Sequence, residues 1–216
     1  MSAEKATVFV VDDDVSVRKA LARAIQAADL NVKTFVSARE FLDQNPPEGR
    51  GCLVLDVHMP GVSGLDLQAE LNSRDIRTPI IFITGQGTIP ASVKAMKGGA
   101  VDFLTKPFKV KDLLKVIKEA LKKDERLQVA RMEKAGIQAR IQSLTARERE
   151  VLGLVIKGQL NKQIAVELGT AVRTVKVHRG RMMHKMQVQS VAELVHAMER
   201  LTTEGGSLEV RTTKVS

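Results

Sequence analysis

The sequence predicts two parts: an α/β domain built on a parallel sheet, followed by an all-α domain of the helix-turn-helix type. Three observations lead to this fold class. Over roughly the first 120 residues, apolar runs of strand length alternate five times with helical patterns. Two of these strands end at acidic residues. The second part carries four short helical patterns with a glycine turn between the second and third.

The predicted elements of the first part follow from where apolar runs begin and end. Strands are expected at residues 7–12, 32–35, 52–56, 79–83 and 101–104. Helices are expected at 17–28, 38–43, 64–72 and 89–97, and a last one begins near Val110. Strands that are apolar throughout belong to a sheet covered on both faces, so helices are expected on each side.

The stretch after the last of these helices is polar and charged and contains no proline. Apolar residues nevertheless recur at a spacing of three and four from Leu113 through Leu127 and Ile137 to Leu144, interrupted by two lysines and a glycine. We therefore predict that the last helix continues through the linker, where it could pair in a dimer. The predicted boundaries are 1–123 for the first domain, 124–143 for the helical linker, 144–201 for the second domain and 202–216 for a disordered tail.

Helix-start signals organise the second part. Thr145 to Glu148 form a capping box that opens a helix ended by Gly158, and Ser190 to Glu193 form another that opens the fourth helix. Between them, helices are expected at 161–168 and 172–186.

The helix at 172–186 has two faces. Val175, His178, Met182 and Met186 are predicted to pack inward, and Arg173, Lys176, Val177, Gly180, Arg181 and His184 are predicted to face outward. The stretch carries five Lys or Arg residues and no acid, whereas a merely solvated face usually includes Glu. Long cations and the methyl groups of a valine suit the major groove of duplex DNA.

The amino-acid composition indicates which kinds of molecule this protein is expected to bind. The formal charge is +9 and the pI is about 9.8, which favours a polyanion. The absence of Trp and Tyr makes single-stranded nucleic acid a poor fit, and duplex DNA a better one. The single cysteine, Cys52, indicates a reducing cytoplasmic location, and no apolar run is long enough to cross a bilayer, so a membrane is not an expected partner.

The ends of the predicted strands carry a coherent set of side chains: Asp12, Asp13, Asp56, Thr84 and Lys106. In an open α/β sheet, ligands bind beyond the carboxyl ends of the strands. Clustered carboxylates repel one another unless a cation joins them, and hard oxygen ligands suit Mg²⁺. With Lys106 as a second positive charge, Asp56 is predicted to act as a nucleophile that accepts phosphate as an acyl phosphate.

The motifs VVDDD, VLDVHMPG, FITG and FLTKPF, in this order and spacing, resemble the receiver domain of bacterial two-component response regulators. That resemblance implies a flavodoxin-like sheet of order 2-1-3-4-5 and a sensor histidine kinase as partner. It implies that Asp56 is the phosphoacceptor, contacted by Thr84 and Lys106, and that Thr84 and Phe103 switch on phosphorylation. Asp12, Asp13, Asp56 and the backbone carbonyl of His58 are the implied Mg²⁺ ligands, and Lys106-Pro107 the implied cis peptide.

The motifs LTARERE, GQLNKQIAVELG and RTVKVHRGRMMHKM resemble the LuxR-type module of the NarL/FixJ subfamily. By that resemblance, Lys176 and Val177 match positions that reach base edges, while contacts with the DNA backbone are expected from Asn161, Lys162, Thr174, Arg181 and Lys185. Arg173, on the outward face of the same helix, is a further expected DNA contact. Two positions depart from the pattern. Ala171 replaces the favoured Ser cap, and Gly180 stands where a DNA-contacting side chain is common.

The resulting hypothesis is a cytoplasmic, phosphorylation-dependent transcriptional regulator that binds duplex promoter DNA, forms a homodimer when phosphorylated and has RNA polymerase as a further partner. It resembles regulators of aromatic-compound catabolism of the styrene and toluene type. One alternative keeps the receiver but makes the basic module an adaptor for protein or RNA. An enzyme of the haloacid-dehalogenase-type phosphatase class is disfavoured, because such enzymes carry Asp two residues after the nucleophile, where this chain has His58.

Overall fold

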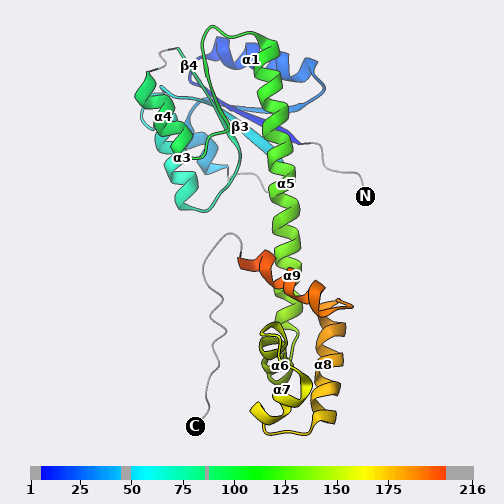
Figure 1. The fold of residues 1–216 in the computed structure, drawn as a ribbon. Coiled ribbons are helices and arrows are strands. Elements are labelled where there is room, and N and C mark those ends of the chain that lie inside the picture. Colours follow the sequence, from blue (N-terminus) through cyan, green and yellow to red (C-terminus); the bar gives the residue numbers. More distant parts are fainter. Residues whose placement is uncertain (1–5, 45–49, 86–87, 203–216) are drawn as a thin grey trace. The chain divides into compact units, whose positions relative to one another are not determined.

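The chain forms two compact units, residues 1–128 and 129–216 (Figure 1). The computed structural model describes residues 6–44, 50–85 and 88–202. The segment 45–49, whose two prolines and glycine predict an exposed loop, and all but the first residue of the predicted disordered tail lie outside the described residues. No helix in the described part of the chain combines the length and the apolar character that crossing a membrane requires.

The first unit is built on a five-stranded parallel sheet of order β2-β1-β3-β4-β5, which confirms the predicted class and topology. The strands are β1 (Thr7–Val11), β2 (Asn31–Phe35), β3 (Gly51–Asp56), β4 (Ile80–Thr84) and β5 (Asp102–Thr105). Val11 pairs with Leu55, and Asp56 pairs with Ile83. The carboxyl ends of β1, β3 and β4 therefore meet at one edge of the sheet.

Helices cover both faces of this sheet, as the unbroken apolar runs predicted (Figure 1). On one face, α1 (Val15–Ala27) and the start of α5 (Val110–Gln142) pack against Val8, Val10 and Cys52. On the other, α2 (Ala38–Asp43), α3 (Gly64–Ser73) and α4 (Ile89–Lys97) pack against a cluster that includes Phe9 and Val11. Successive residues of β1 thus contribute to opposite cores, because side chains alternate along a strand.

Helix α5 is a single helix of 33 residues, so the predicted continuation through the linker is confirmed. The predicted apolar seam is not buried along its whole length, because Lys123 and Ala130 are exposed. Leu113 and Ala120 are buried in the first unit, whereas Ile137 is buried in the core of the second.

The second unit contains the end of α5 and the four predicted helices: α6 (Ala146–Ile156), α7 (Asn161–Glu167), α8 (Val172–Met186) and α9 (Val191–Thr202). The capping box of Thr145 and Glu148 is formed at the start of α6. Gly158 and Gly169, which follow α6 and α7, have φ of 79° and 58°. Glycine adopts this left-handed conformation without steric cost, which allows the tight turns between these helices.

Candidate functional site

Two carboxylates and one ammonium group meet at the carboxyl edge of the sheet. Asp12 follows β1 directly and Asp56 is the last residue of β3. Lys106, after β5, places Nζ 2.8 Å from Oδ2 of Asp12 and 2.9 Å from Oδ1 of Asp56. The two acidic side chains are only 1% and 6% exposed, against 25% for the lysine. The structure therefore brings together side chains that are up to 94 residues apart in sequence.

Burial and hydrogen bonding have opposite effects on the pKa values of Asp12 and Lys106. Desolvation raises the pKa of Asp12, although hydrogen bonds from Lys106 and from the backbone N–H of Asp14 act in the other direction. Burial alone would lower the pKa of Lys106, but its bonds to Asp12 and Asp56 outweigh that effect and raise it. The ammonium group is therefore held in its charged form between two desolvated carboxylates.

Backbone and side-chain groups nearby fix these carboxylates in place. The N–H of His58 donates to Oδ2 of Asp56 at 2.7 Å, and the N–H of Asp14 donates to Oδ1 of Asp12 at 2.8 Å. The guanidinium group of Arg18 donates to the backbone oxygen of Asp12 at 2.6 Å. Asp14 also caps α1 by accepting hydrogen bonds from two backbone N–H groups. The sequence carried that signal, because an Asp just before a helical pattern is a common N-cap.

The side chain of Asp13, the residue that follows Asp12, is exposed. Within the described residues, no three Asp, Glu, His or Cys side chains are arranged as a ready-made metal site. The donor chemistry nevertheless fits a divalent cation. Asp12 and Asp56 bring two negative charges into a buried site that Lys106 alone neutralises only in part, and all the donors are hard oxygens.

The predicted switch residues occupy the neighbouring strands. Thr84, the last residue of β4, is fully buried, and its Oγ1 lies 3.2 Å from Nδ1 of His58. Phe103 is partly buried and packs against Phe82, with ring centroids 6.3 Å apart. The peptide bond between Lys106 and Pro107 is cis, as the resemblance implied. The imidazole contact with Thr84 was not predicted, because the sequence assigned His58 only a backbone role.

Helix α8 presents the two faces that its sequence predicted. Val175, Met182 and Met186 are fully buried, and His178 is half-buried. The residues predicted to face outward are all exposed, namely Arg173, Lys176, Val177, Gly180, Arg181 and His184. Ala171 provides no side-chain cap for this helix, as expected for a residue without a polar group. The exposed face thus carries cations without a neighbouring acid from the same helix.

Two of the other predicted DNA contacts, Asn161 and Lys185, have protein partners in this structure. Asn161 accepts a hydrogen bond of 2.8 Å from Arg179. Lys185 donates to Oε2 of Glu148 at 2.7 Å and to the backbone oxygen of Ser143 at 3.2 Å. Lys162 and Thr174 are exposed. Arg179 and Glu148 were not predicted to contact these residues, because the contacts join different helices.

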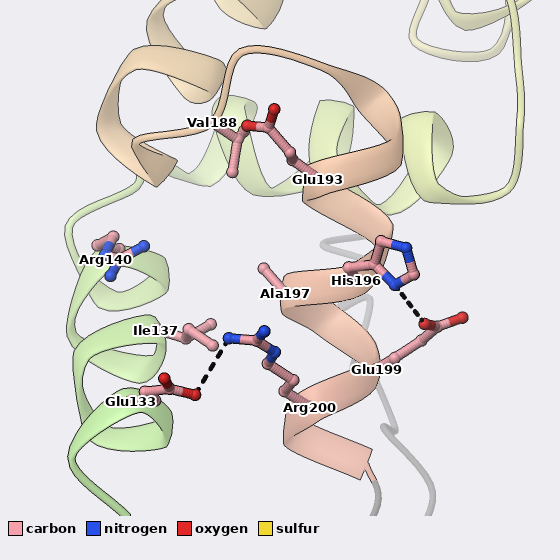
Figure 2. A pocket seen from close by; sticks show the side chains of 9 residues that line it. All are labelled: Glu133, Ile137, Arg140, Val188, Glu193, His196, Ala197, Glu199 and Arg200. Atoms are coloured by element: carbon pink, nitrogen blue, oxygen red, sulfur yellow. Dashed lines mark hydrogen bonds and ion pairs between the residues drawn. The ribbon is translucent and has the colours of Figure 1, made fainter. Parts of the chain in front are cut away.

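A separate pocket of about 760 Å³ lies between α9 and the part of α5 that belongs to the second unit (Figure 2). Its walls carry charges of both signs, and Arg200 forms an ion pair of 3.1 Å with Glu133 across it. His196 pairs with Glu199 on the same helix at 3.2 Å. None of the predicted site residues lines this pocket.

Two protein families match the two units. Residues 8–118 match the response regulator receiver domain, and residues 142–198 match the luxR family of bacterial regulatory proteins. Nodulation protein W of Bradyrhizobium diazoefficiens is 47% identical over 200 residues, which cover 93% of this chain and 88% of that protein. Response regulator protein TmoT of Ectopseudomonas mendocina is 45% identical over 201 residues, covering 93% of this chain and 91% of that one.

Solved structures agree with these matches. The response regulator StyR has 48% sequence identity and a TM-score of 0.82, and the alignment covers 91% of this chain and all of that one. Full-length FixJ from B. japonicum has 39% identity and a TM-score of 0.57, covering 91% of this chain and 97% of the other.

Proposed function

Because the chain belongs to the response regulators that join a receiver domain to a LuxR-type DNA-binding domain, we propose that Asp56 accepts the phosphoryl group that controls its binding to DNA. The protein is a phosphorylation-dependent transcriptional regulator, and a sensor kinase is its partner. The observation that carries the assignment to Asp56 is its place at the end of the central strand β3, where Lys106 and Asp12 converge on it.

The proposed reaction transfers a phosphoryl group from a phosphohistidine of the kinase. A carboxylate oxygen of Asp56 attacks phosphorus, a P–O bond forms and the P–N bond to the imidazole breaks. The imidazole leaves with the bonding electron pair and takes up a proton. Lys106, whose ammonium group already contacts Asp56, neutralises negative charge on the phosphoryl oxygens. Nothing in this scheme requires a general acid from the receiver, so the protein acts as phosphoacceptor.

Three carboxylates and one backbone oxygen would hold a Mg²⁺ ion at this site: Asp12, Asp13, Asp56 and the carbonyl of His58. The ion supplies positive charge that offsets the repulsion between the carboxylates and an incoming phosphoryl group. The burial of Asp12 and Asp56 supports this role, because a single lysine leaves them with excess negative charge. The exposed side chain of Asp13 would supply the third carboxylate.

Phosphorylation changes the hydrogen bonding of Thr84 in this proposal. The phosphoryl group adds a charge of about −1.5 to −2, which attracts the Thr84 hydroxyl away from His58. Phe103, packed beside Phe82, then rearranges with it. The nearby helix α4 exposes Ile89, Val93 and Met96, which are 80%, 45% and 48% exposed. Burial of this apolar surface favours a homodimer, and a dimer aligns two recognition helices with two DNA half-sites.

Helix α8 is proposed to enter the major groove. Lys176 and Val177, exposed at the centre of its outward face, read base edges. Arg173, Thr174 and Arg181 contact phosphates from the same face, and Lys162 contacts them from α7. Asn161 and Lys185 reach DNA only if they exchange their bonds to Arg179 and Glu148 for phosphate, so we assign them secondary contributions.

Selection of binding sites from random duplexes tests this function. Wild-type protein treated with acetyl phosphate is expected to enrich one inverted-repeat sequence and to bind it far better than random duplex. Asp56→Ala is expected to lose the phosphorylation-dependent gain but to keep salt-dependent nonspecific affinity. If treated wild-type protein enriches no sequence, the helical module is an adaptor for protein or RNA. If Asp56→Ala still forms an acyl phosphate, the assigned acceptor is wrong.

A further inference from the structure

A buried acid on α5 plays no part in the site described above. Asp124 is 6% exposed, whereas its neighbours Lys123 and Glu125 are exposed. It follows Leu113, Ile117 and Ala120 along α5 at helical spacing, and these three are fully buried against the sheet. Asp124 thus occupies the next inward position of the same face, where an apolar residue would be usual. Burying a carboxylate is unfavourable unless it is hydrogen-bonded.

The carboxylate of Asp124 is bonded to the strand that carries Asp56. Its Oδ2 accepts a hydrogen bond of 3.0 Å from the backbone N–H of Gly51, the first residue of β3. Gln128, one turn further along α5, donates to the same oxygen at 3.3 Å. Beside this bond, Glu125 forms an ion pair of 2.8 Å with Arg50. We call these contacts of α5 with residues 50–51 the α5–β3 clasp.

Tight packing fixes the strand side of the clasp. A side chain at Gly51 would overlap the backbone oxygen of Thr7 and the ring of Phe9, so only glycine fits there. The amide of Gly51 is therefore held in one position, to which the carboxylate of Asp124 must come. The negative charge of Asp124 also affects the buried thiol of Cys52. Burial, and secondly this charge, raises the pKa of Cys52 to about 12.

The clasp lies at the opposite end of strand β3 from the phosphoacceptor. Gly51 begins β3 and Asp56 ends it, and all six residues of the strand are buried between β1 and β4. Asp124 and Gln128 lie close to the point where the first unit ends, at residue 128 of α5. A single buried strand thus connects the phosphoacceptor with the part of α5 where the first unit ends.

We infer that Asp124 is a positioning residue that ties the exit of α5 to β3, and that this tie is needed to pass the phosphorylation state on to the DNA-binding module. The inference rests on the proposed role of Asp56. Coupling between sites is carried by contiguous packed elements, and here the chain of contacts is Asp56, β3, Gly51 and Asp124. Glu125 contributes less, because its ion pair with Arg50 is half-exposed.

Two substitutions of Asp124 distinguish the effect of losing the hydrogen bond to Gly51 from a general effect on folding. Asp124→Leu removes the acceptor but continues the apolar face of α5, whereas Asp124→Asn keeps an acceptor oxygen of the same reach. Glu125→Gln is the matched control on the exposed side of the clasp. For each full-length variant, thermal unfolding, the amount of acyl phosphate formed from acetyl phosphate, and DNA affinity with and without acetyl phosphate are measured.

Allosteric coupling typically changes affinity by about 5- to 150-fold. We expect phosphorylation to raise DNA affinity by the same factor in wild type, Asp124→Asn and Glu125→Gln. Asp124→Leu is expected to lose most of this increase while still forming acyl phosphate. If Asp124→Leu does not fold, Asp124→Ser, whose hydroxyl is too short to reach Gly51, carries the same expectation. A purely structural role would lower the unfolding temperature and leave the gain unchanged.

The outcomes separate the inference from the function on which it rests. A folded Asp124→Leu or Asp124→Ser protein with the wild-type gain overturns the inference, and so does an Asp124→Asn protein that is as defective as Asp124→Leu. If wild-type protein itself forms no acyl phosphate or shows no gain, the proposed role of Asp56 fails instead.

Discussion

Nδ1 of His58 lies 3.2 Å from Oγ1 of Thr84, so the side chain two residues after Asp56 is hydrogen-bonded to the hydroxyl that is proposed to move on phosphorylation. A bond made only in the unphosphorylated arrangement favours that arrangement. A net hydrogen bond contributes about 0.5–1.5 kcal/mol, which corresponds to about a 2- to 10-fold shift of a two-state equilibrium.

We therefore expect His58→Ala to raise DNA binding of the unphosphorylated protein by about 2- to 10-fold. The backbone groups of residue 58 that serve Asp56 remain. His58→Asn, which keeps a polar side chain, is the control, and fluorescence anisotropy with a labelled operator measures the change. Equal affinity of wild type and His58→Ala without phosphodonor would show that the imidazole does not restrain Thr84.

Asp12→Asn is expected to stabilise the receiver at neutral pH. Desolvation raises the pKa of Asp12 above its usual value of 3.8, so its ionised form is less favourable in the folded protein than in the unfolded chain. Stability linked to this group is therefore greatest below pH 3.8 and falls as the pH rises through the raised pKa. Urea denaturation should show the gain from Asp12→Asn at pH 7 and its disappearance below pH 3.8.

The same substitution should lower acyl phosphate formation, because it removes a proposed Mg²⁺ ligand. Lys19→Gln, at an exposed position of α1, is a control for the loss of a surface charge. If Asp12→Asn is less stable than wild type at pH 7, the ion pair with Lys106 outweighs the desolvation of the carboxylate.

Glu148→Ala is expected to destabilise the second unit by about 1–3 kcal/mol, since it removes the partner of Lys185 and the carboxylate that accepts the capping-box hydrogen bond from the N–H of Thr145. Hydrogen bonds from Lys185, and then from the N–H of Thr145, lower the pKa of Glu148 below 4.5. The stabilisation is therefore present above pH 4.5 and lost as the pH falls through the lowered pKa. Denaturation at a series of pH values should show the full difference between wild type and variant at pH 7, and a smaller one as the pH falls below 4.5. Glu150→Ala, in an exposed pair with Arg147, is the control.

Gly180→Ala and Gly153→Ala form a matched pair of helix substitutions. An added Cβ meets nothing within 4 Å at either position, so each is expected to stabilise the protein by up to about 1 kcal/mol. Only Gly180 lies on the exposed face of α8, where the missing side chain would let DNA approach the helix backbone in the proposed complex. Gly180→Ala should therefore weaken operator binding while Gly153→Ala leaves it unchanged. Unchanged binding by both would mean that Gly180 does not lie against DNA.

Lys176→Ala should reduce discrimination between operator and random duplex more than it reduces nonspecific affinity. Loss of a base-edge contact is expected to cost about 1–3 kcal/mol of specific binding. Titrations against both duplexes at several salt concentrations measure this difference, with Lys157→Ala, outside α8, as the control. A uniform loss on both duplexes would assign Lys176 to a phosphate.

Local patterns in the sequence were sufficient to predict most elements. The bounds of α2, α4 and α8 agree with the predicted ranges. Side-chain caps precede α2 and α4, and the turn at Gly169 precedes α8. The inward and outward faces of α8 followed from helical periodicity alone. The acidic strand ends could also be predicted from local sequence, because the apolar strand and the acid that ends it are adjacent in the chain.

Contacts between distant segments could not be predicted in this way. The sequence named Asp12, Asp56 and Lys106, but only the packing of β1, β3 and β5 in one sheet decided that a single ammonium group binds both carboxylates. From the sequence, Asp124 was one of many charged residues in a polar linker. Only the packing of α5 against the sheet showed that its carboxylate binds the N–H of Gly51. The sequence determined which residues form strands and helices, because that depends on neighbours a few positions away. Tertiary structure decided which side chains meet, because that depends on strand order and helix packing across the whole domain.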